Sequence, residues 1–342
     1  MSTRALSFFV LVACAVLSIG APISRAEAGI LRDKLMEKRM ERQQAAQQAE
    51  RPAMEDDEAN RTQQHALPAG IRRLSDVGYG NSALQTMDVY LPADTHASVA
   101  KNMPVIFMVH GGAWKIGDKS AAAVVTNKIK RWVPQGVIFI SVNYRMLPQA
   151  RPLQQAEDVA RALAFAQSRA ADWGGDRQKF VLFGHSAGAH LVALLASSPE
   201  ISAHAGAGPW LGTVALDSAA YDVNEIMSNR HYRFYDEAFG SDPAYWRANS
   251  PLIQLTQAGA PFLAVCSSLR PDHPCVQAEH FVNKAHTLGM SASLLPQKLN
   301  HLDINQRLGQ DSDYTASVEN FLRSLDASLR QRLSGNAGPV AY

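Results

Sequence analysis

The stretch from Lys179 to Leu195 constrains the fold of this chain more than any other. It opens with the apolar run Phe180-Val-Leu-Phe183, which is typical of a buried strand, and it closes with small and apolar residues at helical spacing. Between them lies Gly-His-Ser186-Ala-Gly, whose glycines suit a turn so tight that a Cβ would collide with neighbouring backbone. We therefore expect a strand, a sharp turn and a helix, with the Ser186 hydroxyl held at the turn as a nucleophile.

Apolar segments of strand length alternate with helical patterns along most of the chain. The expected strands cover residues 75–80, 86–92, 104–109, 137–142, 180–183, 212–216, 262–266 and 291–295. The expected helices cover residues 120–132, 154–171, the segment after the serine, 276–288 and 315–325. The first two strands are typical of an antiparallel edge pair, and the continuous apolar runs that follow are typical of strands buried on both faces. The alternation predicts an α/β fold, with a mostly parallel eight-stranded sheet and helices on both faces.

Composition divides the chain into segments of different character. Residues 71–330 hold the expected strands and helices and form one α/β domain. Within it, residues 218–250 are rich in aromatic side chains and form an insertion that we expect to cover the site as a small cap. Residues 29–70 are rich in Arg, Lys, Glu and Gln, which indicates a charged helical or disordered linker. Residues 331–342 form an expected disordered tail.

The N-terminus resembles a secretory signal peptide. A short basic start is followed by a mostly apolar run over residues 5–20, and Ala-Glu-Ala28 supplies small residues at the cleavage positions. We expect cleavage after Ala28, so that residues 1–28 are removed and the mature protein is secreted or periplasmic, without a transmembrane segment. The alternative is a lipoprotein, because Leu-Val-Ala-Cys14 resembles a lipobox that would leave Cys14 as the lipidated first residue.

Export changes what the remaining cysteines mean. Without the signal segment the chain keeps only Cys266 and Cys275, an even pair in an oxidising compartment. We expect a disulfide bond between them. Two buried free thiols, which are common in protein cores, are the alternative.

The charge balance bears on the class of partner. The chain has 33 Lys and Arg residues against 31 Asp and Glu residues, a formal net charge of +2. A balance this close to neutral implies no nucleic-acid or anionic-surface partner.

A second glycine-rich turn follows the third expected strand, with the sequence His110-Gly-Gly-Ala-Trp114. Adjacent glycines let the backbone approach a ligand and present N–H groups to it. In hydrolases with a nucleophile elbow, one oxyanion donor comes from this loop and the other from the residue after the serine. We therefore expect Gly111 or Gly112, together with Ala187, to form an oxyanion hole.

A serine nucleophile needs a histidine base and a carboxylate that orients it. In this architecture the chain order is serine, acid, histidine, so the base lies downstream of Ser186. His301 is the best candidate, because it lies in the loop after the last core strand, from which an imidazole reaches the elbow. Of the others, His190 points along the helix after the serine and has an expected structural role, and His280 and His286 lie on a predicted helix.

Two aspartates compete for the position of the acid. Asp272 follows the seventh expected strand, lies between the two cysteines, and is separated from His301 by a helix and a strand. We expect Asp272 to be the acid and the disulfide to hold its loop in place. Asp217, at the end of the preceding strand, is the rival, and Asp303 is a weaker one.

Together these motifs resemble the hormone-sensitive-lipase-like esterases of the α/β-hydrolase fold, and among them the feruloyl and acetyl-xylan esterase-like proteins and the kynurenine-formamidase-like enzymes. The resemblance covers about residues 76–325 and rests on Tyr79-Gly80, Leu91-Pro92, His110-Gly-Gly112, Gly117-Asp-Lys119, Asn143-Tyr-Arg145, Gly184-His-Ser-Ala-Gly-Ala-His-Leu191 and Phe239-Gly240. The chain departs from the family at Cys266-Ser-Ser, where a His-Gly or similar small-residue turn is usual, and after His301, where an aromatic residue is often found.

The resemblance implies a serine carboxylic ester hydrolase that uses no metal and no organic cofactor. Catalysis would proceed through Ser186, His301 and Asp272 by way of an acyl-enzyme, on a small or polysaccharide-linked ester. Trp114 and His185 are the residues that we expect to contact substrate. The alternatives are an amidase or arylformamidase with the same triad, and a non-catalytic binding protein on the same fold.

Overall fold

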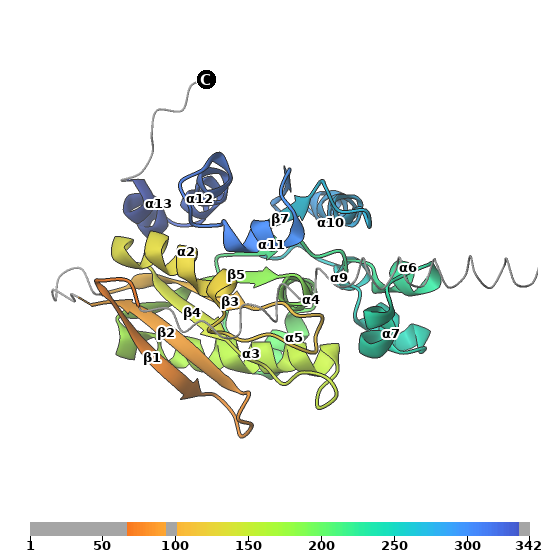
Figure 1. Ribbon diagram of the computed structural model, residues 1–342, viewed down its shortest axis with the longest axis horizontal. Coiled ribbons are helices and arrows are strands. Elements are labelled where there is room, and N and C mark those ends of the chain that lie inside the picture. Colours follow the sequence, from red (N-terminus) through yellow and green to blue (C-terminus); the bar gives the residue numbers. More distant parts are fainter. Residues whose placement is uncertain (1–66, 94–100, 335–342) are drawn as a thin grey trace, which may run out of the picture. The chain divides into compact units, whose positions relative to one another are not determined.

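The computed structural model of the protein describes residues 67–93 and 101–334 (Figure 1). Its eight-stranded sheet has the strand order β1-β2-β4-β3-β5-β6-β7-β8. The strands are β1 (Ile71–Gly78), β2 (Thr86–Pro92), β3 (Met103–Val109), β4 (Ile138–Val142), β5 (Gly175–His185), β6 (Gly212–Leu216), β7 (Phe262–Ser267) and β8 (Ala292–Gln297). The β1–β2 and β2–β4 pairs are antiparallel and the other pairs are parallel. The predicted α/β class and the antiparallel edge pair are thereby confirmed.

The strand order determines where a site can form. Strands β5, β6, β7 and β8 are parallel neighbours, so their carboxyl ends meet at one edge of the sheet, where ligands bind in open α/β folds. Every residue of β3, β4 and β6 is buried. This burial on both faces explains why their sequences are continuous apolar runs.

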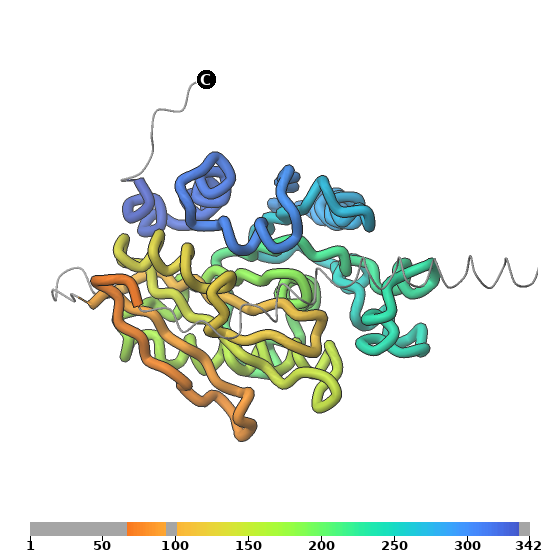
Figure 2. The backbone as a smooth tube through the Cα atoms, viewed as in Figure 1, coloured from red at the N-terminus to blue at the C-terminus, as the bar shows by residue number. Residues whose placement is uncertain are grey.

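Helices cover both faces of the sheet. They are α2 (Ala122–Trp132), α3 (Pro152–Arg169), α4 (Ala187–Ser197), α5 (Pro199–His204), α10 (Pro274–Thr287), α12 (Asp313–Leu325) and α13 (Ala327–Leu333). Helices α2, α12 and α13 pack together on one face, around Trp132 and Leu322. Figure 2 shows these C-terminal helices beside α2, although they lie far from it in the sequence. Helices α3 and α4 pack on the other face with Phe107 and Leu163. Helix α13 extends beyond residue 330, where the sequence analysis ended the domain.

Short helices fill the segment between β6 and β7. They are α6 (Val223–Ser228), α7 (Arg233–Phe239), α8 (Pro243–Ala248) and α9 (Pro251–Gln254). Aspartates cap two of them, because Asp222 accepts a hydrogen bond from the α6 backbone and Asp242 accepts one from the α8 backbone. The rings of Phe234, Tyr235 and Phe239 on α7 pack against Trp114. The insertion therefore contacts the loop that follows β3.

The structure also contains a helix where the sequence analysis expected a loop, α11 (His301–Gln306). Asn300 caps it by accepting a hydrogen bond from the Asp303 N–H (2.7 Å). The buried Lys128 of α2 donates to the Asn305 carbonyl oxygen (2.7 Å) and to Asn305 Oδ1 (2.8 Å). Because His301 is the first residue of α11, these contacts fix the segment that presents it.

Several predictions lie outside the described residues: the signal segment 1–28 with its cleavage after Ala28, the lipidation alternative at Cys14, the linker over residues 29–66, and the tail from residue 335. Among the helices that are described, none combines the length and the apolar character needed to cross a bilayer.

Candidate active site

Ser186 lies at the turn between β5 and α4, with φ 54° and ψ −118°, a conformation that a non-glycine residue rarely adopts. Two glycines make this turn possible. A Cβ on Gly184 would lie 2.3 Å from the Gly188 carbonyl oxygen, and a Cβ on Gly188 would lie 2.3 Å from the Val109 carbonyl oxygen at the end of β3. The turn therefore packs against its own helix and the neighbouring strand, as the elbow motif predicts.

The segments expected to form the oxyanion hole border this serine. The Ser186 N–H donates to the Leu216 carbonyl oxygen (2.9 Å), so it is engaged in the sheet. Ala187 begins α4, and the first N–H groups of a helix have no partner within it. A Cβ on Gly111 would lie 2.9 Å from the Ser186 Cβ, which shows how closely this loop approaches. Gly112 has φ 109°, a conformation that favours glycine.

His301 and Asp217 form the central polar contact of the site. The His301 Nδ1–H donates to Asp217 Oδ2 at 2.6 Å. Asp217 follows β6 directly, has φ 57°, and its side chain is 0% exposed. Its second oxygen, Oδ1, accepts from the Ser267 N–H at 2.7 Å. Burial alone would raise the pKa of the Asp217 carboxyl, but the hydrogen bond from His301 and the charge of Arg270 outweigh it and hold this pKa below its usual range.

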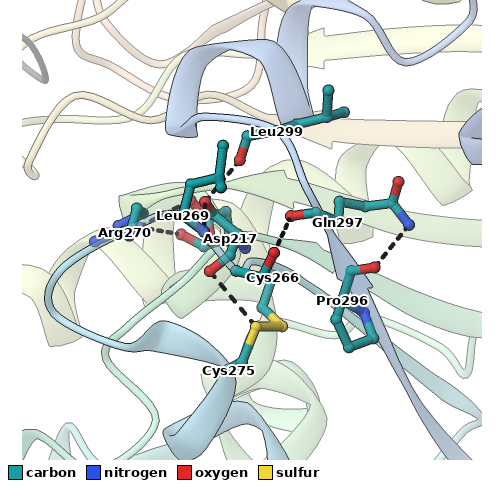
Figure 3. The surroundings of a disulfide bond; sticks show 10 residues. Asp217, Cys266, Leu269, Arg270, Cys275, Pro296, Gln297 and Leu299 are labelled. Atoms are coloured by element: carbon teal, nitrogen blue, oxygen red, sulfur yellow. Dashed lines mark hydrogen bonds and ion pairs between the residues drawn. A yellow bond between two sulfur atoms is a disulfide. The ribbon is translucent and has the colours of Figure 1, made fainter.

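The structure corrects the predicted pairing of Asp272 with His301. The Asp272 carboxylate accepts from Arg270 Nε at 2.9 Å and from Arg270 Nη2, and its side chain is 20% exposed. The loop after β7 directs the Arg270 guanidinium toward Asp217 (Figure 3). The same guanidinium binds Asp272 through Nε and Nη2. The rival aspartate, at the end of β6, is therefore the one that contacts the imidazole.

Arg270 is the residue of this site that the sequence analysis missed. Its Nη1 donates to Asp217 Oδ2 (2.9 Å) and to the Asp217 carbonyl oxygen (3.1 Å), and lies 3.0 Å from His301 Nδ1. Its side chain is 18% exposed. One signal was available in the sequence. An arginine stands two residues before Asp272, in a loop that already departs from the family pattern at Cys266-Ser-Ser.

His185, a predicted substrate contact, lies beneath the imidazole of His301. Its Nε2–H donates to the His301 carbonyl oxygen (3.1 Å), and the centroids of the two rings are 4.6 Å apart. Burial, followed by the charge of His301, lowers the pKa of His185 well below its ordinary value. His185 is thus held neutral, and its ring supports His301, the first residue of α11.

Trp114, the other predicted substrate contact, is buried, with 3% of its side chain exposed. Its Nε1–H donates to His190 Nδ1 (3.3 Å), and its ring packs edge-on to Phe239 with centroids 4.9 Å apart. In this conformation Trp114 joins the loop after β3 to α4 and α7. The structural role expected for His190 agrees with this arrangement, because its Nε2–H also donates to the Asn249 carbonyl oxygen (2.8 Å).

The predicted disulfide between Cys266 and Cys275 is confirmed, with Cα atoms 5.2 Å apart (Figure 3). It joins the end of β7 to the first turn of α10. The loop it closes contains Arg270 and Ser267, which both donate to Asp217, as well as Asp272. The disulfide therefore holds the residues that surround the acid candidate rather than that acid itself.

The described residues contain no group of three or more His, Cys, Asp or Glu side chains that could hold a metal ion. The hydrogen bonds at this edge of the sheet join His301, Asp217 and Arg270 instead.

A sequence model described as BD-FAE matches residues 87–284, which is more than half of the chain. The chain belongs to the BD-FAE family. Among its relatives, Esterase LipC of Mycobacterium tuberculosis is 29% identical over 62% of this chain and 55% of its own length. A probable isoprenylcysteine alpha-carbonyl methylesterase of Oryza sativa is 33% identical over 46% of this chain and 37% of its own. The kynurenine formamidase of Danio rerio is 28% identical over 52% and 58%.

The chain spans about half the length of LipC and of a second esterase of Mycobacterium tuberculosis, LipQ. Solved structures show the same fold. Esterase B from Lactobacillus rhamnosis superposes with a TM-score of 0.66 at 19% identity, covering 85% of this chain and 96% of its own. Esterase 2 from Thermogutta terrifontis superposes with a TM-score of 0.61 at 20% identity, covering 77% and 96%. The BD-FAE member described here therefore has the α/β-hydrolase fold.

Proposed function

We propose that this BD-FAE protein is a serine carboxylic ester hydrolase, with Ser186 as nucleophile, His301 as base and Asp217 as acid. The observation that carries the proposal is the 2.6 Å hydrogen bond from His301 Nδ1 to the buried Asp217 carboxylate. The His301 ring packs on His185, the residue directly before the serine of the elbow. With the proton on Nδ1, the lone pair of His301 lies on Nε2, which is the tautomer a general base requires.

In the first step, His301 Nε2 takes the hydroxyl proton of Ser186 while Oγ forms a bond to the ester carbonyl carbon. The carbonyl oxygen becomes an oxyanion, and we assign its donors to the backbone N–H groups of Ala187 and of Gly111 or Gly112. The ester C–O bond then breaks, and the proton on Nε2 passes to the departing alcohol. The acyl group remains on Ser186.

In the second step, a water molecule gives a proton to His301 Nε2 and its oxygen attacks the acyl carbon. The bond from that carbon to Ser186 Oγ breaks, Oγ takes the proton back, and the carboxylic acid leaves. The ionised Asp217 orients the imidazole and stabilises the imidazolium in both steps, without itself taking a proton.

The proposal moves the acid from the end of β7 to the end of β6. Asp217 lies 2.6 Å from His301 Nδ1, whereas Asp272 contacts Arg270. The order of serine, acid and histidine along the chain is the same for both aspartates, so order alone did not distinguish them. The strand-end position of Asp217, on the strand adjacent to that of Ser186, supports the choice.

The names of the relatives support the reaction class, since Esterase LipC and the isoprenylcysteine methylesterases are named for ester substrates. For the substrate we propose a small or polysaccharide-linked ester, in keeping with the export that residues 1–28 predict. The kynurenine formamidase of Danio rerio favours a second candidate, an amidase or arylformamidase that would use the same residues.

A substrate panel tests the proposal directly. Purified protein is assayed against short p-nitrophenyl esters, acetylated and feruloylated oligosaccharides, and aryl formamides, with Ser186→Ala as the control. Ester turnover that disappears in the variant supports the hydrolase, and turnover of formamides in preference to esters supports the second candidate. Undiminished ester turnover in Ser186→Ala would refute both.

A further inference from the structure

Arg270 lies between two carboxylates, and one of them belongs to the proposed triad. On one side its Nη1 donates to Asp217, to both the side chain and the main chain. On the other side its Nε and Nη2 donate to Asp272, so that one edge of the guanidinium is held by a two-point contact. The Arg270 side chain is 18% exposed, so water competes little for these contacts.

We propose that Arg270 is a positioning residue for the His301–Asp217 pair, acting through Asp217 and held in register by Asp272 and the loop that the disulfide closes. This inference rests on the proposed function and extends it. Arg270 touches neither substrate nor the reacting oxygen in the mechanism above, so its effect is exerted on the acid and the base.

The geometry around Asp217 Oδ2 explains how Arg270 would act. Two donors share this oxygen, His301 Nδ1 at 2.6 Å and Arg270 Nη1 at 2.9 Å, and they lie 3.0 Å from each other. Because both nitrogens point their hydrogens at one oxygen, the carboxylate cannot rotate away without breaking both bonds. The Ser267 N–H on Oδ1 completes the restraint.

The charge of Arg270 acts on the imidazole as well. A permanent cation lies beside Nδ1, and it faces the negative charge of the ionised Asp217 across the same contact. Other charged or titratable groups lie nearby. His185 on β5 packs on the His301 ring, Asp272 and Tyr235 interact with Arg270, and Lys128 on α2 interacts with His185. Asp303 is in the first turn of α11. The charge of Asp217 also reaches two buried phenols, Tyr221 and Tyr314. Within the described ranges, Arg270 is the cation placed against a ring nitrogen of His301.

The loop after β7 is built to hold this arginine. The disulfide fixes both ends of the loop, from Cys266 to Cys275. Inside it, Ser267 Oγ donates to the Leu299 carbonyl oxygen (2.6 Å), two residues before His301. The same short segment thus contacts Asp217 through Ser267 and Arg270, and contacts the chain leading to His301. Figure 3 shows Arg270 directed toward Asp217.

Two substitutions separate the geometric effect of Arg270 from its charge. Arg270→Gln removes the charge and the fork, and we expect kcat to fall on the order of 10- to 100-fold with KM little changed, since small displacements of catalytic groups are costly. We also expect the pH profile of kcat/KM to shift, because the site loses a permanent positive charge beside the His301–Asp217 pair. Arg270→Lys keeps the charge but lacks the planar fork, so we expect kcat to fall while the pH profile of kcat/KM stays as in the native protein.

Arg307→Gln is the matched control. Arg307 follows α11, the helix that begins at His301, and its side chain is 51% exposed with a 3.9 Å contact to Asp303. The Arg307→Gln substitution removes a positive charge near the same helix without changing a contact of Asp217. We therefore expect kcat and the pH profile to stay as in the native protein.

A readout without substrate keeps this inference distinct from the proposed function. The proton in the His301–Asp217 hydrogen bond should give a downfield proton resonance, which Asp217→Asn identifies by removing it. We expect this resonance to shift or broaden in Arg270→Gln and to persist in Arg307→Gln. Failure of the proposed function would show as Ser186-independent turnover, which leaves this measurement unaffected.

An unchanged resonance together with unchanged kcat and pH profile in Arg270→Gln would overturn the inference. If Arg270→Gln does not fold, Arg270→Lys decides the matter, because native kcat and a native resonance in that variant would equally exclude a positioning role.

Discussion

At the scale of single residues, the site depends on backbone conformations that few side chains accept. Ser186 and Asp217 both have positive φ, 54° and 57°, and each directly follows its strand. Such conformations cost on the order of 1–3 kcal/mol and persist where the surrounding structure fixes them. The hydrogen bond from the Ser186 N–H to Leu216 links the two turns, so one main-chain contact aligns the proposed nucleophile with the proposed acid.

Ser186→Ala is expected to lower kcat by on the order of 10⁴–10⁶ while the fold stays intact, because the nucleophile acts as a unit with its base. Steady-state kinetics on a p-nitrophenyl ester measure the loss, and the thermal unfolding midpoint is the control. A loss of less than about tenfold would contradict the assignment of Ser186 as the nucleophile.

Asp217→Asn and Asp272→Asn form a matched pair. We expect Asp217→Asn to lower kcat by on the order of 10³–10⁴, because Asn cannot fix the imidazole tautomer. Asp272→Asn should cost no more than about tenfold, since it weakens only the outer contact of Arg270. Kinetics of both variants on one ester decide between the two aspartates. A nearly native Asp217→Asn with an inactive Asp272→Asn would reverse the assignment.

The residue types of the site could be predicted from the sequence, but one pairing could not. Ser186 and the glycines are fixed by a local motif, and His301 by its position after the last core strand. The acid depends on how a loop turns, because Asp217 directly follows β6 whereas Asp272 lies in the loop after β7. The deciding contacts, from His301 and Arg270 to Asp217, join residues of different elements, which no sequence period reports.

At the scale of elements, two short segments deliver His301 and restrain Asp217. The loop from Cys266 to Cys275 supplies two donors to Asp217. Helix α11 begins at His301 and is tied to α2 through Lys128. Burial lowers the pKa of the Lys128 ammonium to about 7, although the acceptors around it, the carbonyl oxygen of Ala123 and two oxygens of Asn305, favour the charged form.

The double substitution Cys266→Ser with Cys275→Ser tests the role of the disulfide. Closing so short a loop should contribute roughly 2–3 kcal/mol to the free energy of unfolding by the chain-entropy estimate. We expect the open loop also to lower kcat, since Arg270 and Ser267 lose their restraint. Urea unfolding and ester kinetics measure the two effects. Native kcat in a destabilised variant would show that the disulfide acts on stability alone.

At the scale of the whole molecule, one buried histidine joins three parts of the fold. His190 on α4 accepts from Trp114 of the loop after β3 (3.3 Å) and donates to the Asn249 carbonyl oxygen after α8 (2.8 Å). This arrangement requires the neutral ring, with the proton on Nε2. Burial lowers the pKa of His190 to about 4.

The stability of the protein should therefore depend on pH through His190. Because its pKa in the folded state lies below the ordinary value, the stability is complete above about pH 6.5 and is lost as the pH falls toward 4. The loss from this residue approaches about 3 kcal/mol.

Urea unfolding of the native protein and of His190→Gln, between about pH 7 and pH 4, measures this loss. Glutamine keeps a donor and an acceptor but does not titrate, so its curve should be flatter. Parallel curves for the two proteins would rule out His190 as the source.

Most of the fold could be predicted from the sequence, because the buried strands are long apolar runs and α2, α3, α10 and α12 span at least three turns. Helices α11 and α13 were not predicted. Each has only six or seven residues, too few to show a helical period, and each depends on caps such as Asn300 and Asp326.

The position of the proposed acid has a consequence for how this protein can change over evolution. The proposed nucleophile and acid follow two adjacent strands, β5 and β6. Main-chain pairing up to His185 and Leu216 sets the alignment of these strands. The loop after β7, which contains Asp272, is thereby released from supplying the carboxylate. We expect that this loop can be exchanged, in evolution or by protein engineering. The condition is that each replacement offers Asp217 one backbone N–H and one cation, in place of those of Ser267 and Arg270.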